Sequence, residues 1–426
     1  MIVLIGGLIL LASALSTRYM SGSWVAPVPT YCAVWGSALV GCSFFGPLFR
    51  PLFPLDERVV LFYVLGAFVF SLGAWVPAIW GPARVSAGAR YQLRAGAFGV
   101  ITFAVVLTLP FAYWHVMDIL AGVPITDVLF YARMIDVNAS KGVGQSIFGP
   151  YANLITLSIA AAIVAYTVSV EGWLLRCRQL IFFVAALAPT LAGGRSASVG
   201  FIFSVVALIA FRGELRVKKI LGLAGVFFLL FFGVALLVKK GVSLESSRSE
   251  QIVGLLQGLR DYAFGGVTAF QRVLLSPGEV PSTSNVTRTA LEALNHLGAH
   301  YTVPPLHAAF STIGESVATN VYTTYFSYLD FGFIGATALV FAYGMVVGWM
   351  YRLARAGNAI CLALYASLFA GMVLSVFGEG FYSNINFLAK LTLCSFVLLK
   401  RAPTENHALN GSLRSTELDR SEVALS

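Results

Sequence analysis

The chain has 426 residues, of which 58% are hydrophobic and only 11% are charged. Soluble domains carry about 25% charged residues, so this composition excludes an ordinary soluble protein. The net charge of +9 would suit nucleic-acid binding, but the basic residues follow the pattern of a membrane topology instead. We therefore expect no nucleic-acid partner.

Long apolar segments predict membrane-spanning helices, because a bilayer core roughly 30 Å thick requires about 20 residues of helix. Eleven such segments lie near 2–17, 28–48, 59–80, 96–117, 150–170, 178–191, 197–211, 220–238, 325–351, 359–377 and 385–400. The sequence thus predicts an all-α polytopic integral membrane protein with about 11 transmembrane helices. We expect helices 1–8 over 1–238 with an outer loop at 118–149, a large periplasmic loop with amphipathic helices over 239–324, helices 9–11 over 325–400, and a disordered cytoplasmic tail over 401–426.

The basic residues predict the orientation of these helices. Lys and Arg are concentrated in 18–27, 81–95, 171–179, 212–219 and 352–358, and they recur at Lys400 and Arg401. Since basic loops stay in the cytoplasm, we expect the N-terminus and the large loop outside and the C-terminus inside. The first apolar segment has no preceding basic residue and no small-residue cleavage site, which favours a retained helix over a signal peptide.

The sequence carries no sign of metal or nucleotide chemistry. The five cysteines lie mostly within predicted spans, and no pair has the spacing of metal ligands. No glycine-rich phosphate loop of the Gly-Lys-Ser/Thr kind is present. We therefore expect no cofactor and no metal, and an activated substrate that already resides in the membrane.

Arg195 is the most informative single residue. It lies in Gly193-Gly194-Arg195-Ser196, between apolar segments of about 14–15 residues that are short for a full crossing. This spacing predicts a tight hairpin or a broken helix. An Arg at such a place is costly unless it meets a partner, a cavity or a ligand, and its planar fork suits phosphate oxygens. We favour a ligand contact over a side chain that merely reaches the outer surface.

The two long outer loops exceed the usual length of a connector. The loop at 118–149 is either a solvated connector or a lid over an outward-facing cavity. In the larger loop, apolar residues recur at helical spacing at Ile252, Leu255, Leu256, Leu259 and Ala263, with Gln251, Gln257, Arg260 and Asp261 opposite. This pattern predicts a helix in the membrane interface. We expect it to break at Gly265-Gly266 and to resume over 268–272, before a segment that carries His296, His300 and His307.

The segment 314–332, which leads into the ninth predicted span, combines carboxylates, amides, hydroxyls and aromatic rings. The residues that supply these groups include Glu315, Asn320, Tyr322, Asp330 and further tyrosines. Such a set resembles a carbohydrate site, although an aromatic belt at the interface, or a role for Asp330 at the start of the helix, would also explain parts of it. Farther on, Glu379 and Lys390 are ionisable groups near the outer surface, and an ion pair between them would be a structural explanation for both.

Three stretches resemble elements of one known family. They are Leu191-Ala-Gly-Gly-Arg-Ser196, Tyr262-Ala-Phe-Gly-Gly-Val-Thr-Ala-Phe270 and Asn320-Val-Tyr-Thr-Thr-Tyr-Phe-Ser-Tyr-Leu-Asp-Phe-Gly-Phe-Ile-Gly335. The family is that of bacterial oligosaccharide repeat-unit polymerases, the O-antigen or Wzy-type polymerases. The specific motifs cover only a small part of the chain, whereas the number of spans and the placement of loops are similar throughout.

The resemblance implies a metal-independent membrane glycosyltransferase of GT-C-like architecture in the bacterial inner membrane. Such an enzyme transfers a growing glycan from undecaprenyl diphosphate to the non-reducing end of a new lipid-linked repeat unit, on the outer face of the membrane. Its partners would be the undecaprenyl-diphosphate-linked oligosaccharide, the lipid bilayer and a polysaccharide chain-length regulator. The alternatives are a ligase that moves finished polymer to an acceptor, and a transporter or flippase of lipid-linked sugars.

That chemistry needs cations to stabilise the departing diphosphate and a base for the attacking hydroxyl. We expect Arg195 to be the leading diphosphate contact, followed by Arg260 and Arg272. Glu315 is the candidate base, with His300 and His307 as rivals. The residues expected to line or brace the acceptor side are Tyr262, Asn320, Tyr322 and Asp330.

Overall fold

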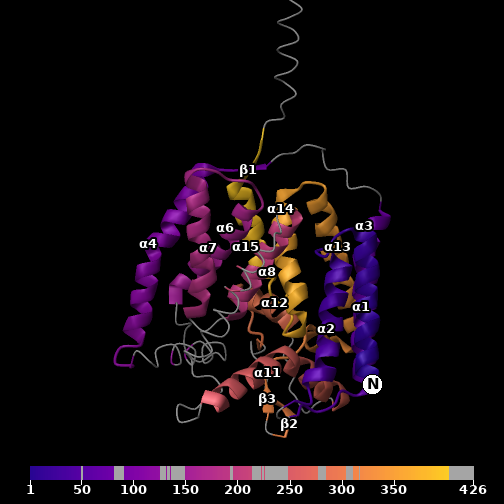
Figure 1. Ribbon diagram of the computed structural model, residues 1–426. Coiled ribbons are helices and arrows are strands. Elements are labelled where there is room, and N and C mark those ends of the chain that lie inside the picture. The colour runs from indigo at the N-terminus through magenta and orange to yellow at the C-terminus, as the bar shows by residue number, and fades with distance from the viewer. Residues whose placement is uncertain are drawn as a thin grey trace, which may run out of the picture.

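A computed structural model shows a mostly helical protein, in which long helices stand side by side as a bundle (Figure 1). The structure describes residues 1–48, 51–80, 91–124, 149–191, 195–213, 248–276, 285–303, 310–315 and 317–402, and the single positions 131, 135, 222 and 225. The bundle helices are α1 (Ile2–Ser21), α2 (Pro27–Phe45), α3 (Glu57–Ile79), α4 (Ala95–Ile119), α6 (Ala152–Tyr166), α7 (Trp173–Leu191), α8 (Arg195–Phe211), α13 (Gly332–Arg355), α14 (Ala359–Val373) and α15 (Ile385–Leu398).

Six helices in the described part of the chain are long and apolar enough to cross a bilayer, so the protein is a membrane protein. They are α1, α2, α3, α4, α13, and α14 together with the short 3₁₀ helix η4 (Leu374–Val376) that continues it. Shorter apolar helices lie at Asn153–Tyr166, Ala197–Phe211 and Ile385–Leu398. Each of these helices falls on a predicted span. The span predicted at 220–238, most of the loop at 118–149 and the tail after 402 lie outside the described residues, and the number of 11 crossings stays a prediction.

The N-terminus and the large loop were predicted to lie outside the membrane and the basic segments in the cytoplasm, and these two groups lie at opposite ends of the bundle. Met1, at the start of α1, lies at the same end as the large loop, at the bottom of Figure 1. At the other end, strand β1 (Tyr91–Leu93) pairs antiparallel with β4 (Leu399–Arg401), so that Gln92 faces Lys400. Residues 91–93 and 400–401, both predicted to be cytoplasmic, therefore meet at one end, opposite the N-terminus.

Helices α3 and α13 pack at backbone distance because glycines line their contact. A Cβ atom built on Gly344 would lie 2.2 Å from the carbonyl oxygen of Phe70, and one on Gly348 would lie 2.3 Å from that of Ala74. From the other side, a Cβ on Gly73 would lie 2.2 Å from the carbonyl oxygen of Phe341. Gly344 and Gly348 are spaced as in the small-xxx-small motif, which lets membrane helices approach closely. The sequence analysis did not single out this motif.

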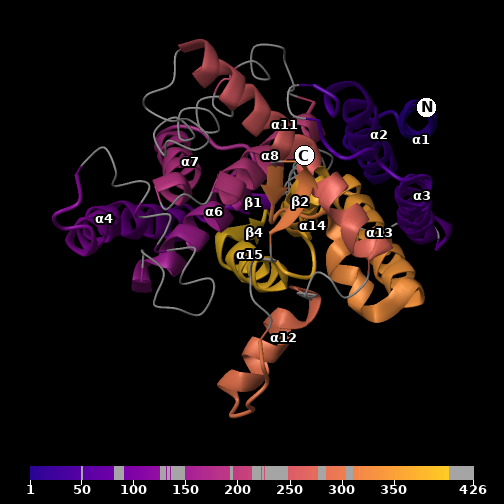
Figure 2. The same ribbon diagram turned by 90° about the horizontal axis from the view of Figure 1, so that it is seen from below.

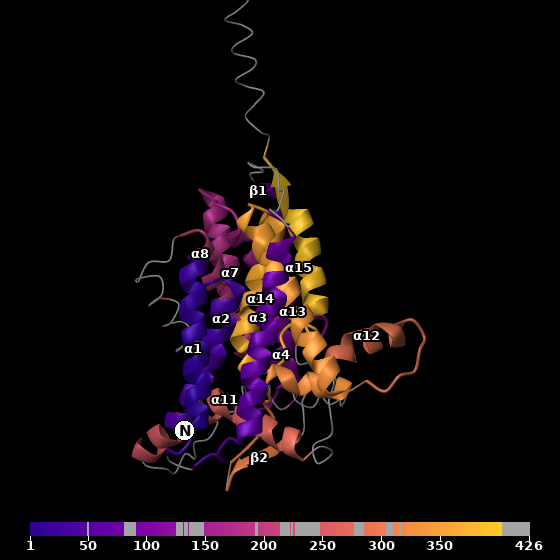
Figure 3. The same ribbon diagram turned by 90° about the vertical axis from the view of Figure 1, so that its right-hand side faces the viewer.

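The large loop forms a layer across the end of the bundle, which we call the cap. The cap comprises α11 (Arg248–Leu275), a hairpin of β2 (Ser311–Gly314) and β3 (Val317–Thr319), and the segment 320–331, which includes the 3₁₀ helix η3 (Thr324–Phe331). Figure 1 shows α11 lying across the foot of the upright helices. Helix α12 (Asn285–His296) projects sideways from the bundle (Figures 2 and 3).

The expected break at Gly265-Gly266 is wrong, because α11 continues through both glycines. A Cβ on Gly266 would lie 2.8 Å from the carbonyl oxygen of Val376, and one on Gly265 would lie 3.0 Å from Cδ1 of Ile313. The glycines thus permit close packing of α11 against η4 and the hairpin. This packing offsets the helix propensity that each glycine loses, about 1 kcal/mol relative to alanine.

The ninth predicted span begins later than expected. Residues 324–331 form η3, and α13 starts only at Gly332, whose φ of 65° lies in the left-handed region that glycine adopts without strain. The residue that precedes α13 is Phe331, and no side-chain hydrogen bond closes the helix start. The side chain of Asp330 lies outside the described residues.

Candidate functional site at the cap

The cap is fixed to the start of α3 by side chains of α11 and α3. Gln271 accepts a hydrogen bond from the backbone N–H of Asp56 at 2.6 Å and donates to the carbonyl of Pro54 at 3.0 Å. Tyr63 of α3 donates from its buried hydroxyl to the carbonyl of Val267 in α11, at 2.8 Å. These bonds determine how α11 lies on the bundle.

Arg260 lies on the face of α11 opposite the apolar stripe, as predicted, but this face meets the bundle. The residue is only 5% exposed. Its Nε and Nη2 donate to Oδ1 of Asp261 at 2.9 and 2.6 Å, and Nη1 donates to the carbonyl of Leu48. Its charge is thus matched within the chain, which indicates that Arg260 holds α11 against the segment after α2.

Arg272 is the exposed cation of the cap that lies beside a predicted acceptor residue. It donates from Nη1 to the hydroxyl of Thr312 in β2. Tyr322 lies close to Arg272. Burial raises the pKa of Tyr322, and the positive charge of Arg272 partly opposes this shift. The phenol of Tyr322 therefore stays protonated at neutral pH. The structure brings together Arg272 and Tyr322, two of the residues predicted from the sequence.

The β2–β3 hairpin carries Glu315 at its turn, where the residue is exposed. The hairpin is docked on the chain after α2, because the N–H of Phe53 donates to the carbonyl of Ile313 at 2.8 Å and Leu52 bridges Gly314. His300 is exposed and follows α12, whereas Glu315 belongs to the β2–β3 hairpin. His307 lies outside the described residues. Asn320 is half-buried directly after β3.

Arg195 is the first residue of α8, so α7 and α8 form the hairpin that the spacing predicted. Helix α8 packs along α14, and a Cβ atom built on Gly200 would lie 3.6 Å from Cδ1 of Leu374, the first residue of η4. In the first turn of α8, the hydroxyl of Ser198 is fully buried and has no hydrogen-bond partner among the residues that the structure describes, which exclude 192–194. The side chain of Arg195 lies outside the described residues. A helix N-terminus favours anions through its free N–H groups and its dipole, so this helix start suits a phosphate group.

The tyrosines of the segment 314–332 are buried and form neither an interface belt nor an open stacking surface. Tyr322 stacks on Phe326 with ring centroids 4.3 Å apart. Tyr325 is fully buried against Trp35 of α2, with centroids 5.0 Å apart, and its hydroxyl lies 3.2 Å from that of Tyr31. These rings join the cap to the bundle.

Four buried polar atoms around these rings have no hydrogen-bond partner among the described residues. They are Nε1 of Trp35 and the hydroxyls of Ser311, Thr323 and Ser375. Buried polar groups normally find a partner in the protein or in ordered water. The junction between cap and bundle is therefore polar as well as aromatic.

Tyr262, from the second motif, is half-buried in α11.

The expected ion pair between Glu379 and Lys390 is wrong. Oε1 of Glu379 accepts from the N–H groups of Phe381 and Tyr382 at 2.6 and 2.8 Å, and Oε2 accepts from the N–H of Ser383 at 2.6 Å. The hydroxyl of Tyr328 in η3 donates the fourth hydrogen bond to this carboxylate, to Oε1 at 3.2 Å. Lys390 donates instead to Asn153 of α6 at 3.0 Å. Glu379 is the residue of this region whose role the sequence analysis missed; its position between two glycines was the available signal.

Replacing Glu379 with alanine should destabilise the protein by roughly 1–3 kcal/mol, because several N–H groups lose their acceptor. The E379Q variant keeps one acceptor oxygen and should lose less. Thermal unfolding of the purified protein in nanodiscs measures both. Glu57→Ala, which removes an exposed carboxylate from the first turn of α3, is the control; an E379A midpoint equal to that of this control would contradict the assigned role.

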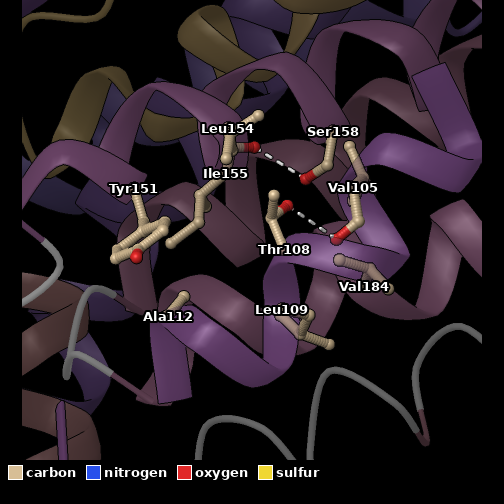
Figure 4. A pocket seen from close by; sticks show the side chains of 9 residues that line it. All are labelled: Val105, Thr108, Leu109, Ala112, Tyr151, Leu154, Ile155, Ser158 and Val184. Carbon is tan, nitrogen blue, oxygen red and sulfur yellow. Dashed lines mark hydrogen bonds between the residues drawn. The ribbon is translucent and has the colours of Figure 1, made fainter. Parts of the chain in front are cut away.

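A crevice between α4, α6 and α7 offers no reactive group. It is lined by nine residues, shown in Figure 4, and holds about 240 Å³ of empty space including its open mouth. Of its three hydroxyls, two are engaged with their own helices, since Thr108 donates to Ala104 at 2.6 Å and Ser158 donates to Ile155 at 2.7 Å. The third is the phenol of Tyr151. The crevice is thus an apolar hollow within the bundle.

Within the described part of the chain, no group of three or more His, Cys, Asp and Glu side chains could hold a metal ion. The cysteines are free thiols. Comparison of the chain with protein-family models, with curated proteins and with solved structures finds no match.

Proposed function

We propose that the protein polymerises lipid-linked oligosaccharide repeat units on the outer face of the bacterial inner membrane, as a multi-pass glycosyltransferase. It transfers the growing glycan from undecaprenyl diphosphate to the non-reducing end of a new repeat unit. A new glycosidic bond forms as the bond to the diphosphate breaks, and the acceptor hydroxyl gives up its proton to a base. The product is a surface polysaccharide.

The start of α8 is the observation on which the proposal mainly rests. Arg195 opens this helix after two glycines, and the hydroxyl of Ser198 is buried there without a partner among the described residues. Free N–H groups, a guanidinium and a hydroxyl are donors of the kind that a departing diphosphate requires. Arg272 on the cap is the second cation of the proposed site. Arg260, which is paired with Asp261, supports the position of α11.

The orientation of the chain supports a site on the outer side. Basic residues lie in the last turns of α1 and α13, at Arg18, Arg352 and Arg355, and they recur in β4. This end of the bundle is the cytoplasmic one by the positive-inside rule. The cap then lies on the outer side, where a flipped lipid-linked substrate arrives.

A ligase and a lipid-linked oligosaccharide transporter remain the alternatives, and deletion of the gene distinguishes them. Loss of the polymerase leaves single repeat units on the usual acceptor or on undecaprenyl diphosphate, with no long polymer. Full-length polymer left on its lipid carrier would identify a ligase, and repeat units trapped on the inner face would identify a flippase. Either of these two results would overturn the proposal.

Glu315→Gln is expected to lower polymer formation by about 10²–10⁴-fold, since it removes the proposed base while preserving shape. Glu315 is exposed at a hairpin turn, so the variant should fold and accumulate normally. Gel analysis of surface glycan, normalised to the amount of membrane protein, measures the effect. Retained polymer would transfer the role of base to His300 or His307.

A further inference from the structure

Helix α12 has two chemically distinct faces. At 100° per residue, Val286, Ala290, Ala293 and Leu294 share one side of the helix, and Leu297 follows on the same side. Arg288, Glu292 and Asn295 occupy the opposite side, and Thr289 and Leu291 lie at the two borders. From the sequence we predicted the interfacial helix over 251–263, and this part of the loop was described only as the segment that carries the histidines.

The apolar face of α12 is uncovered toward its end, whereas Val286 at its start packs against the core of the bundle. Leu294 is 43% exposed and Leu297 is 84% exposed. On the polar face, Arg288 and Glu292 form an ion pair at 2.8 Å. The amide of Asn295 holds the returning chain by two bonds of 2.8 Å to the backbone of Tyr301, whose ring is 56% exposed. Leu294, Leu297 and Tyr301 are therefore exposed, whereas Arg288, Glu292 and Asn295 form their polar contacts within this segment.

The position of α12 places this face beside the membrane-spanning surface. Figure 3 shows α12 projecting sideways from the bundle, roughly perpendicular to the upright helices, on the bundle side of the β2–β3 hairpin. Its base contacts η3, which leads directly into α13. There, Phe333 and Ile334 at the start of the spanning helix are 64% and 84% exposed. The uncovered apolar surface of α12 thus adjoins that of a helix that spans the membrane.

We propose that α12 is an interfacial helix that binds the lipid bilayer at the cap end of the bundle. Leu294 and Leu297 insert between lipid chains, and Tyr301 lies at the level of the headgroups, where an aromatic ring with a polar tip is favoured. Lipid is the occupant because the face continues the lipid-facing surface of α13 and because a helix perpendicular to the spans lies in the plane of the interface. The inference is independent of the proposed enzymatic function.

Spin-label accessibility tests this placement in nanodiscs of phosphatidylethanolamine and phosphatidylglycerol. Labels are attached to L294C and L297C in a cysteine-free background, and E292C on the opposite face is the matched control. We expect collisions with oxygen to exceed those with a water-soluble nickel complex at 294 and 297, and the reverse order at 292. Water-like accessibility at 294 and 297 would overturn the proposal, as would protection from both agents, which would mean that a second protein copy covers the face.

A second measurement avoids replacing the native cysteines. A photo-reactive benzophenone amino acid at position 294 or 297 of the unaltered chain should form adducts with the mass of one phospholipid. The same group at 292 should form at least several-fold fewer. Cross-linked dimers without lipid adducts at 294 would contradict the placement even if the cysteine-free protein fails to fold.

Discussion

Arg195→Ala should reduce polymer formation by at least about a hundredfold while the protein remains in the membrane at normal abundance. Removing one donor that stabilises developing charge in a transition state typically costs 10²–10³-fold in rate. Arg195 opens α8 at the cap end, so the change acts on the proposed diphosphate site. Arg195→Lys keeps the charge but loses the planar fork, and it should retain partial activity. The measurement is the glycan ladder per unit of membrane protein.

The matched control for this prediction is Arg176→Ala. Arg176 lies near the start of α7 and is exposed, at the opposite end of the same helical hairpin. It should retain normal polymer length and amount. Full-length polymer from Arg195→Ala at normal abundance would remove Arg195 from the site.

Gly344→Leu should prevent α13 from packing against α3 and so abolish the folded protein. The first side-chain atom alone would lie 2.2 Å from the carbonyl oxygen of Phe70. Because this carbonyl oxygen belongs to the backbone of a second helix, it cannot move aside as a side chain does. The cost should exceed the roughly 1–3 kcal/mol of an ordinary overpacked core. Size-exclusion profiles and thermal unfolding of the detergent-purified protein measure the loss.

Gly96→Leu is the control for Gly344→Leu. Gly96 lies in the first turn of α4, and a Cβ there would meet nothing within 4 Å. This variant should give a normal size-exclusion peak and an unchanged unfolding midpoint. Equal behaviour of the two variants would contradict the close α3–α13 contact.

Local pattern was sufficient to predict the helices and the ends at which they meet. Continuous apolar segments marked α1 to α4 and α13 to α15. Basic residues assigned 81–95 and Lys400 to the same side, and the pairing of 91–93 with 399–401 agrees with this. These features depend on hydrophobicity and charge along short stretches. The hairpin at Arg195 was also predictable, because two short apolar segments flank the glycines.

The cap could not be predicted in this way, since its contacts join residues far apart in the chain. Gly265 and Gly266 have the local signature of a helix break, but packing against Ile313 and Val376 keeps α11 continuous. Glu379 and Lys390 have opposite charges, but four hydrogen-bond donors surround the carboxylate and Asn153 accepts from the ammonium group.

The candidate site was predictable in its chemistry more than in its geometry. The sequence identifies the tyrosines of 314–332 as a group, but burial decides that Tyr325 joins cap to bundle instead of facing a ligand. Likewise, the helical period of α11 places Arg260 on a polar face. Only the fold brings that face against Leu48 and leaves Arg272 as the exposed cation.

The most direct test of the proposed function is reconstitution of the purified protein in liposomes with undecaprenyl-diphosphate-linked repeat units as the sole substrate. The account predicts a ladder of lipid-linked glycans of increasing length and release of one undecaprenyl diphosphate per bond formed, without nucleotide and in the presence of a metal chelator. The Arg195→Ala protein should give neither. Repeat units that stay single under conditions in which the protein is folded and the substrate faces the cap would contradict the account.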